Sequence, residues 1–354
     1  MSRDTLSKLG PWLGFAALVL AVVVSPLVTA NYRTYQFGLV AVYLIALLGL
    51  NILTGFTGQI SLGHGAFVGI GAYTTTILVV DHGWRDLWTV PVAGVVAGAL
   101  GLAFGLIATR FAGPYLALAT FAIPLSFIGL LKRFPHFTGG GIGKNLPQLH
   151  AEFGLDTHPS VWFYGITWAV ALLMLPLALV IVHGRFGRAL RAVRDSEIAS
   201  TANGISTAGI KTAAFGISAF YCGVAGALYA VGITYVNPDT FPIELSILLL
   251  VGIVIGGAGS TWGMIFGAFF VEFIRISWGP ALLEQFDRVY NIDTHAAGSG
   301  LVVYGVILLA VLYVAPAGMA GLIRRLFTGR TAVAAWSKPG RTTPSDPATG
   351  TEGP

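Results

Sequence analysis

The sequence has 354 residues, of which 10% are charged and 55% are hydrophobic, with a formal net charge of +5. A soluble domain carries about 25% charged residues, so this composition excludes an ordinary soluble protein. The single cysteine, Cys222, excludes an intramolecular disulfide and a cysteine-based metal site. The 47 glycines lie mostly in apolar stretches, as is typical of closely packed membrane helices. We expect no metal ion, no cofactor and no nucleic-acid partner.

Apolar stretches long enough to cross a bilayer recur along the chain. A hydrocarbon core of about 30 Å requires roughly 20 apolar residues per helix. We therefore predict an all-α, polytopic membrane protein with about ten transmembrane helices, and eight as the alternative count. The predicted spans cover residues 9–30, 35–54, 59–80, 88–108, 114–131, 161–183, 212–236, 243–255, 261–278 and 300–314.

Two of these spans are irregular. The third, residues 59–80, contains polar residues, and the eighth, residues 243–255, is too short to cross alone. We interpret both as broken or re-entrant helices, which membrane proteins tolerate where the backbone faces protein or a cavity. Five spans in each half would also insert the second half upside down relative to the first, which is the inverted-repeat plan of many transporters.

The positions of the basic residues predict the orientation. With a cytoplasmic N-terminus, the densest group of Lys and Arg, residues 185–211, lies in the cytoplasm, as the positive-inside rule requires. The first apolar stretch also resembles a signal peptide, but its length favours a membrane span. Residues 331–354 are rich in Thr, Pro, Gly and Ala and are expected to form a disordered cytoplasmic tail after a membrane domain of residues 1–330.

Two predicted helices carry glycines at helical spacing. Positions three or four apart share one face of a helix, and glycine there lets another backbone approach closely. These glycines indicate helix packing within the subunit, and the alternative is an interface between subunits. They are Gly94, Gly98, Gly101 and Gly105 in one helix and Gly263 and Gly267 in another.

Residues 49–73 place polar side chains inside an apolar block. Burying an unpaired amide or hydroxyl in hydrocarbon costs several kcal/mol, so these groups must face protein, water or a solute. One interpretation is a polar cluster that stabilises a kink, and the other is the lining of a solute path. The polar residues are Asn51, Thr54, Thr57, Gln59, Ser61 and His64.

The cytoplasmic loop of residues 184–211 has the pattern of an amphipathic helix. Ala189, Leu190, Val193 and Ile198 are expected on one buried face, while the arginines stay in solvent, and Asn203-Gly204 is expected to end the helix. Such a helix either lies on anionic lipid or docks a cytoplasmic partner. No acid, base or metal group of an enzyme converges elsewhere in the sequence, so we predict a protein without catalytic residues.

Three stretches together resemble the LivM-type permease subunits of branched-chain amino acid ABC transporters. They are GLNILTGFTGQISLGHGAFVGIGAY at residues 49–73, GRALRAVRDSEIASTANGI at residues 187–205 and GGAGSTWG at residues 256–263. The resemblance extends over roughly residues 40–325. It implies an import complex in a bacterial inner membrane, with both termini of this chain in the cytoplasm.

The resemblance also implies partners and roles. A LivH-like second permease subunit, two cytoplasmic ATP-binding subunits and a periplasmic solute-binding protein would join this chain in the lipid bilayer. The solute would be a branched-chain or other small amino acid, with urea or a short amide as the alternative, and a secondary transporter or channel is the rival class. ATP hydrolysis would belong to the partner subunits. The residues expected to couple to them are Arg188, Arg191, Arg194, Glu197, Ala199 and Gly204.

Overall fold

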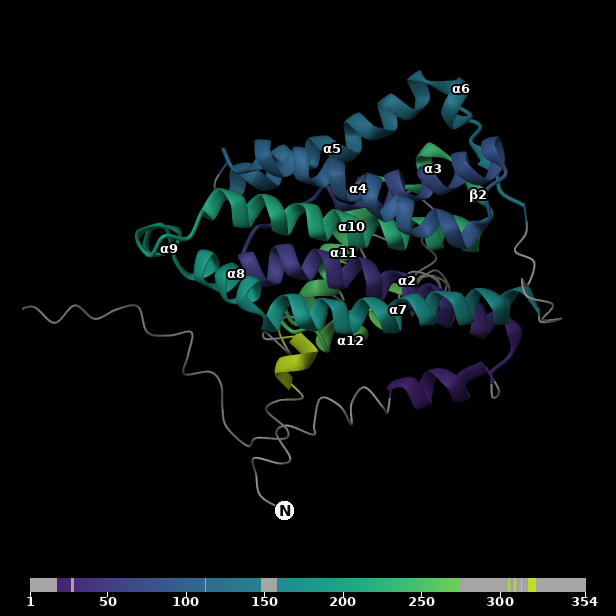
Figure 1. The fold of residues 1–354 in the computed structure, drawn as a ribbon. Helices are drawn as coiled ribbons and strands as arrows, with labels where there is room; N and C mark the ends of the chain where they lie inside the picture. The colour runs from purple at the N-terminus through teal and green to yellow at the C-terminus, as the bar shows by residue number, and fades with distance from the viewer. Residues whose placement is uncertain are drawn as a thin grey trace, which may run out of the picture.

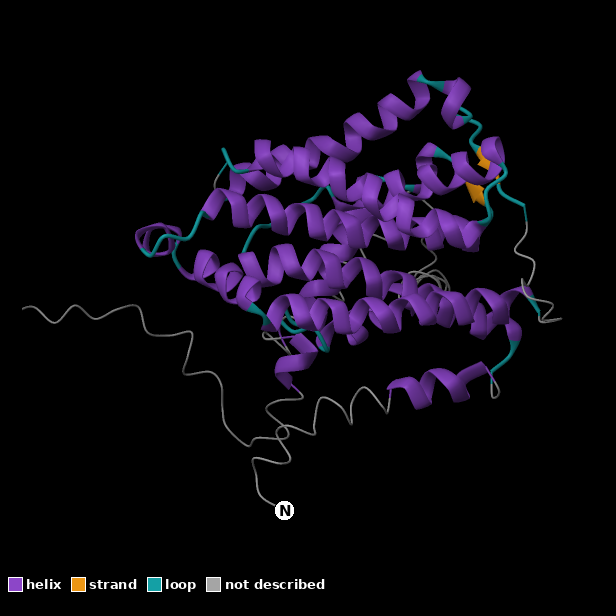
Figure 2. Ribbon diagram, viewed as in Figure 1, coloured by secondary structure: helices purple, strands orange, loops and turns teal. Residues whose placement is uncertain are grey.

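The computed structural model describes residues 18–26, 29–111, 113–147, 158–273, 305, 309, 313 and 318–322. Figure 2 shows that helices make up most of this part of the chain. In the first half, the elements are α2 (Asn31–Asn51), the π-helix η1 (Ile52–Phe56), α3 (His64–His82), α4 (Asp86–Ala108), α5 (Pro114–Arg133), α6 (Pro135–Thr138) and β1 (Lys144–Asn145). The second half contains α7 (Pro159–His183), α8 (Arg185–Asp195), α9 (Glu197–Ala202), α10 (Thr207–Ile233), β2 (Tyr235–Val236), the 3₁₀-helix η2 (Pro238–Thr240), α11 (Ile243–Gly256) and α12 (Gly263–Phe273).

Six stretches of the described chain are long and apolar enough to cross a membrane. They agree with predicted spans to within a few residues at each end, so the prediction of an all-α, polytopic membrane protein is confirmed. The tenth predicted span and the tail of residues 331–354 lie outside or almost wholly outside the described residues, so the inverted repeat stays a prediction. The six stretches are Asn31–Phe56, Asp86–Ala108, Tyr115–Arg133, Pro159–His183, Thr207–Ile233 and Pro238–Gly256.

The helices form a bundle in which α2 and α10 are central (Figure 1). In both central helices, 89% of the most apolar stretch is buried. The buried share of that stretch is 39% in α4 and in α7 and 28% in α5. The outer helices instead expose large apolar side chains such as Leu106, Leu118 and Leu173. Apolar side chains on an outer membrane helix are stable against lipid, so these surfaces suit the bilayer or another membrane subunit.

The two ends of the bundle differ in charge and structure. Helices α8 and α9, which carry the arginine-rich sequence, lie at one end, and α6 and β2 lie at the other (Figure 1). At the second end, β1 pairs with β2 in antiparallel register, with Lys144 opposite Val236. An ion pair of 2.5 Å between Lys144 Nζ and Asp81 Oδ2 ties β1 to α3. The all-α prediction did not include this short strand pair.

Candidate functional site

The segment of residues 49–73 forms a break between two helices. Helix α2 continues into the π-helix η1, residues 58–63 have no regular helix, and α3 begins at His64. Two glycines explain the local shape: a Cβ at Gly55 would overlap the Asn51 side chain and the Gly259 backbone, and Gly58 has a φ of 73°. The third predicted span, residues 59–80, therefore begins with the irregular residues 59–63. Its helical part is α3, which has no break of its own.

Asn51 joins two parts of the chain that are distant in sequence. Its Oδ1 accepts a hydrogen bond of 2.9 Å from the backbone N–H of Gly259, in the loop between α11 and α12. Asn51 is buried, and a buried amide without a partner costs about 1–3 kcal/mol, so this bond stabilises the contact between η1 and that loop.

Three polar residues after Asn51 close the turn locally. Thr54 donates to the carbonyl of Gln59 at 3.0 Å, and Thr57 donates to the carbonyl of Leu53. The Gln59 side chain donates to Thr57 Oγ1 at 3.1 Å. These bonds hold the chain in a tight turn directly after η1.

His64 connects α3 to α10 at the first residue of α3. Its Nδ1 lies 2.9 Å from Ser61 Oγ, and its Nε2 lies 2.7 Å from Ser218 Oγ on α10. All three side chains are fully buried. The next residue, Gly65, donates its N–H to Ser246 Oγ on α11 at 2.9 Å, so the start of α3 is bonded to both neighbouring helices.

The six residues predicted to line a solute path thus have hydrogen-bond partners within the protein. Five of them are buried and Thr54 is partly buried. This arrangement accounts for their presence as a polar cluster, and the solute-lining role stays a prediction. Of the six, Thr57 and Gln59 border a cavity of about 370 Å³ beneath α8.

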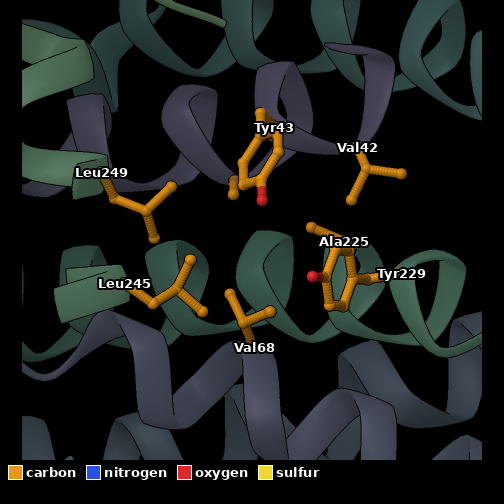
Figure 3. A pocket seen from close by; sticks show the side chains of 8 residues that line it. Val42, Tyr43, Val68, Ala225, Tyr229, Leu245 and Leu249 are labelled. Carbon is orange, nitrogen blue, oxygen red and sulfur yellow. The ribbon is translucent and has the colours of Figure 1, made fainter. Parts of the chain in front are cut away.

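A second cavity lies between α2, α3, α10 and α11. Figure 3 shows Tyr43 and Tyr229 facing its interior among apolar side chains. Their ring centroids are 6.3 Å apart. The cavity holds about 10 Å³, which is room for one water molecule at most, so this cavity is too small for a solute in this conformation.

Helix α8 is amphipathic, as predicted. Leu190 and Val193 are buried, but Ile198 is 86% exposed, so its expected place on the buried face is wrong. The reason is that Ser196 has an extended backbone, with φ of −162° and ψ of 116°, which ends α8 and starts α9 with a different orientation. Asn203 and Gly204 end α9, and Gly204 has a φ of 78°, which confirms the predicted stop.

Two arginines of α8 bond to backbone carbonyls: Arg194 stays exposed, as expected, whereas Arg191 is partly buried, contrary to expectation. Arg191 Nη1 donates to the carbonyl of Val182 at the end of α7 at 2.9 Å. Arg194 Nη1 donates to the carbonyl of Gly55 in η1, also at 2.9 Å. Carbonyls at helix ends carry partial negative charge, which attracts guanidinium groups. Arg194 therefore links α8 directly to the segment of residues 49–73.

The other predicted coupling residues lie around the turn between α8 and α9. Glu197 Oε1 forms an ion pair of 2.5 Å with Lys211 Nζ on α10. The backbone N–H of Ala199 donates to the capping side chain of Ser196 at 3.2 Å. Arg188, Ala199 and Gly204 are exposed. The coupling role of these residues stays a prediction.

The four glycines of α4 face α10 of the same chain. A Cβ at Gly94 would lie 2.8 Å from Val224, one at Gly105 would lie 3.1 Å from Phe215 Cβ, and one at Gly101 would overlap Ala219. On α12, a Cβ at Gly263 or Gly267 would meet the backbone of α11. Both sets therefore allow helices of one subunit to approach closely.

Replacing Gly101 with alanine is expected to lower the free energy of unfolding by about 1–3 kcal/mol, because the added methyl group must push α4 away from α10. Gly129 of α5 is a matched control, since a Cβ there has no atom within 4 Å. Thermal unfolding of both purified variants measures the effect. Equal melting temperatures for the two variants would contradict the close contact.

No group of three or more His, Cys, Asp or Glu side chains that could hold a metal ion occurs within the described residues.

The chain is similar in sequence to several known transport permeases. The chain is 33% identical over 276 residues to the high-affinity branched-chain amino acid transport system permease protein LivM of Salmonella typhimurium, covering 71% of this chain and 65% of that protein. It is 25% identical over 297 residues to LivH of Escherichia coli K12, covering 79% and 91%. It is 29% identical over 149 residues to the autoinducer 2 import system permease protein LsrC of Photorhabdus laumondii, covering 41% and 42%. No solved structure matches the chain.

The chain matches a protein family over residues that include the polar segment of residues 49–73, helix α8 and the loop between α11 and α12. The match is to the branched-chain amino acid transport system / permease component family and includes residues 32–312. The multiple apolar helices of the structure are those expected of such a membrane component. The chain therefore belongs to the branched-chain amino acid transport permease family.

Proposed function

We propose that this chain is a membrane-spanning permease subunit of an ATP-driven ABC importer for branched-chain or other small amino acids. The observation that carries the proposal is the hydrogen bond from Arg194 of the arginine-rich helix α8 to Gly55 in η1. It joins a surface suited to a cytoplasmic partner to the irregular segment inside the bundle. The names of the LivM and LivH relatives support the solute class.

In the proposed complex this chain contacts four kinds of partner. A second, LivH-like permease subunit covers part of the exposed apolar surface, and lipid covers the rest. Two ATP-binding subunits dock on α8 and α9, and a periplasmic binding protein delivers the solute at the end that carries β1 and β2. In this arrangement the complex lies in a bacterial inner membrane with both termini of the chain in the cytoplasm, and the partner subunits hydrolyse ATP.

The mechanism that we propose is alternating access. ATP binding draws the two cytoplasmic subunits together, and α8 moves with them. Because Arg194 bonds to Gly55 and Asn51 bonds to Gly259, movement of α8 reaches both η1 and the loop between α11 and α12. A shift of these elements opens a solute path through the subunit toward one side at a time.

Reconstitution tests the function. Proteoliposomes that contain this chain, the second permease, both ATPases and the binding protein are expected to accumulate radiolabelled leucine when ATP is inside with the ATPases. Omitting the ATPases should abolish accumulation. Full-rate leucine movement through this chain alone would instead indicate a channel and would refute the proposal.

Arg194→Ala is expected to reduce leucine uptake by about tenfold while the complex still hydrolyses ATP. A charge-assisted hydrogen bond is worth about 1.5–3 kcal/mol, and each 1.4 kcal/mol corresponds to a factor of ten. Arg110→Ala is the control, because Arg110 is an exposed arginine in the loop after α4. The ratio of solute imported to ATP hydrolysed is the measurement. An unchanged ratio in Arg194→Ala would remove this bond from the coupling path.

A further inference from the structure

The cavity beneath α8 lies between the moving parts of the proposed mechanism. One wall is residues 57–60 after η1, and the opposite wall is the junction of α8 and α9, residues 193–197. Phe111 and Gly113 before α5, Leu116 of α5 and Lys211 of α10 complete the lining. Its volume of about 370 Å³ falls within the range of about 300–1,000 Å³ that is usual for small-molecule sites.

The charged groups of this lining are balanced. Lys211 is buried and pairs with Glu197 at 2.5 Å, and Arg194 Nε lies 3.5 Å from Asp195 Oδ1. The side chains of Glu197, Arg194 and Asp195 are 54%, 41% and 72% exposed, so these three groups line the open side of the cavity. Two cations and two carboxylates therefore border one space. A ligand with a single charge would disturb this balance, whereas a zwitterion offers one partner to each sign of charge.

The remaining lining separates into polar and apolar parts. Ile60, Phe111 and Leu116 provide apolar surface, and Gln59 provides an amide next to Thr57. A cavity with apolar walls and a few placed polar groups is the usual form of a small-molecule site. An amino acid with an aliphatic side chain matches this lining in charge, in polarity and in size.

We propose that this cavity binds the transported amino acid as a zwitterion on the cytoplasmic side, as the last site before release. The carboxylate of the solute faces Lys211 and Arg194, the ammonium group faces Glu197 and Asp195, and the aliphatic side chain lies against Ile60 and Phe111. The assignment of the solute rests on the proposed function. Because the junction of α8 and α9 forms one wall, movement of the cytoplasmic loop of residues 184–211 changes the cavity and releases the solute.

Thiol labelling tests the site within the complete complex. The sequence has one cysteine, Cys222, which is buried, so Cys222→Ala removes the native thiol of this chain, and labelling is measured on this chain after it is separated from its partners. Ile60→Cys places a thiol in the cavity, and Phe111→Cys is a second position in the same lining. Ala208→Cys is the control, since Ala208 is an exposed residue in the first turn of α10 and lies outside this lining. A charged thiol reagent is added to inverted membrane vesicles without ATP.

Leucine is expected to slow labelling of the two cavity cysteines and to leave the control unchanged. For a directly blocked thiol the rate falls by a factor of 1 + [L]/Kd, which is about threefold at twice the dissociation constant. Isocaproate, which lacks the ammonium group, and isoamylamine, which lacks the carboxylate, should not protect at the same concentration. Equal protection by either analogue would overturn the zwitterion site.

Leucine uptake by the same variants in proteoliposomes separates the two proposals. If the complex imports leucine but leucine at saturating concentration protects neither cavity cysteine, the cavity is not the release site and the proposed function stands. If the complete complex imports no amino acid, the proposed function fails, whatever the labelling shows. Protection at Ala208→Cys equal to that at Ile60→Cys would indicate a general conformational change and would also overturn the site.

Discussion

Gly55→Ala is expected to reduce leucine uptake by more than about tenfold and to lower the melting temperature of the complex. The new methyl group would overlap Asn51 Oδ1 and the backbone nitrogen of Gly259, so the hydrogen bond between these residues must break or η1 must move. Overpacking costs about 1–3 kcal/mol, and the loss of a buried bond adds about 1 kcal/mol. Movement of η1 also displaces the carbonyl that accepts from Arg194.

Gly129→Ala on α5 is the control for Gly55→Ala. A Cβ at Gly129 meets no atom within 4 Å and alanine favours a helix more than glycine, so uptake should stay within error of the parent protein and the melting temperature should not fall. Radiolabelled leucine uptake and thermal unfolding of the purified complex are measured for both. Parent-like uptake by Gly55→Ala would show that the contact between η1 and Gly259 is not needed for transport.

His64→Leu is expected to lower the free energy of unfolding by about 3 kcal/mol. The imidazole bonds to the buried hydroxyls of Ser61 and Ser218, and leucine can accept or donate no hydrogen bond. A buried hydroxyl that loses its partner costs about 1–3 kcal/mol, and the link between α3 and α10 is lost as well. Thermal or denaturant unfolding of the complex in detergent measures the change.

A double-mutant cycle isolates the bond between His64 and Ser218. Adding Ser218→Ala to His64→Leu removes the hydroxyl that lacks a partner, so the double variant should be no less stable than His64→Leu alone. Ser218→Ala by itself should cost about 1 kcal/mol. Additive losses in the double variant would mean that the two residues do not interact, and the bond would then have no part in joining α3 to α10.

The membrane spans were predictable from the sequence because their cause is local. A helix needs about 20 apolar residues to cross the hydrocarbon core, and such stretches end at charges, proline or glycine. The predicted range of residues 161–183 and the observed α7 at Pro159–His183 differ by two residues at one end. The stop after α9 was also local, since Gly204 takes the left-handed conformation that favours glycine.

The partners of the polar residues could not be predicted in the same way. Asn51 and Gly259 are separated by 208 positions, and His64 and Ser218 by 154. The rule that buried polar groups must be satisfied predicted that such partners exist, but it does not say which distant residue supplies them. Periodicity likewise placed Ile198 on the buried face, because it assumed one continuous helix and Ser196 ends α8.

The sequence by itself determined the class of the protein, its apolar spans and the polar segment between two of them. These follow from composition and from patterns repeated over a few helical turns. Only the tertiary structure decided that Arg194 reaches Gly55 and that the junction of α8 and α9 closes a cavity against residues 57–60. Those contacts depend on how separate helices pack, and packing is decided by the shapes of side chains that are far apart in the chain.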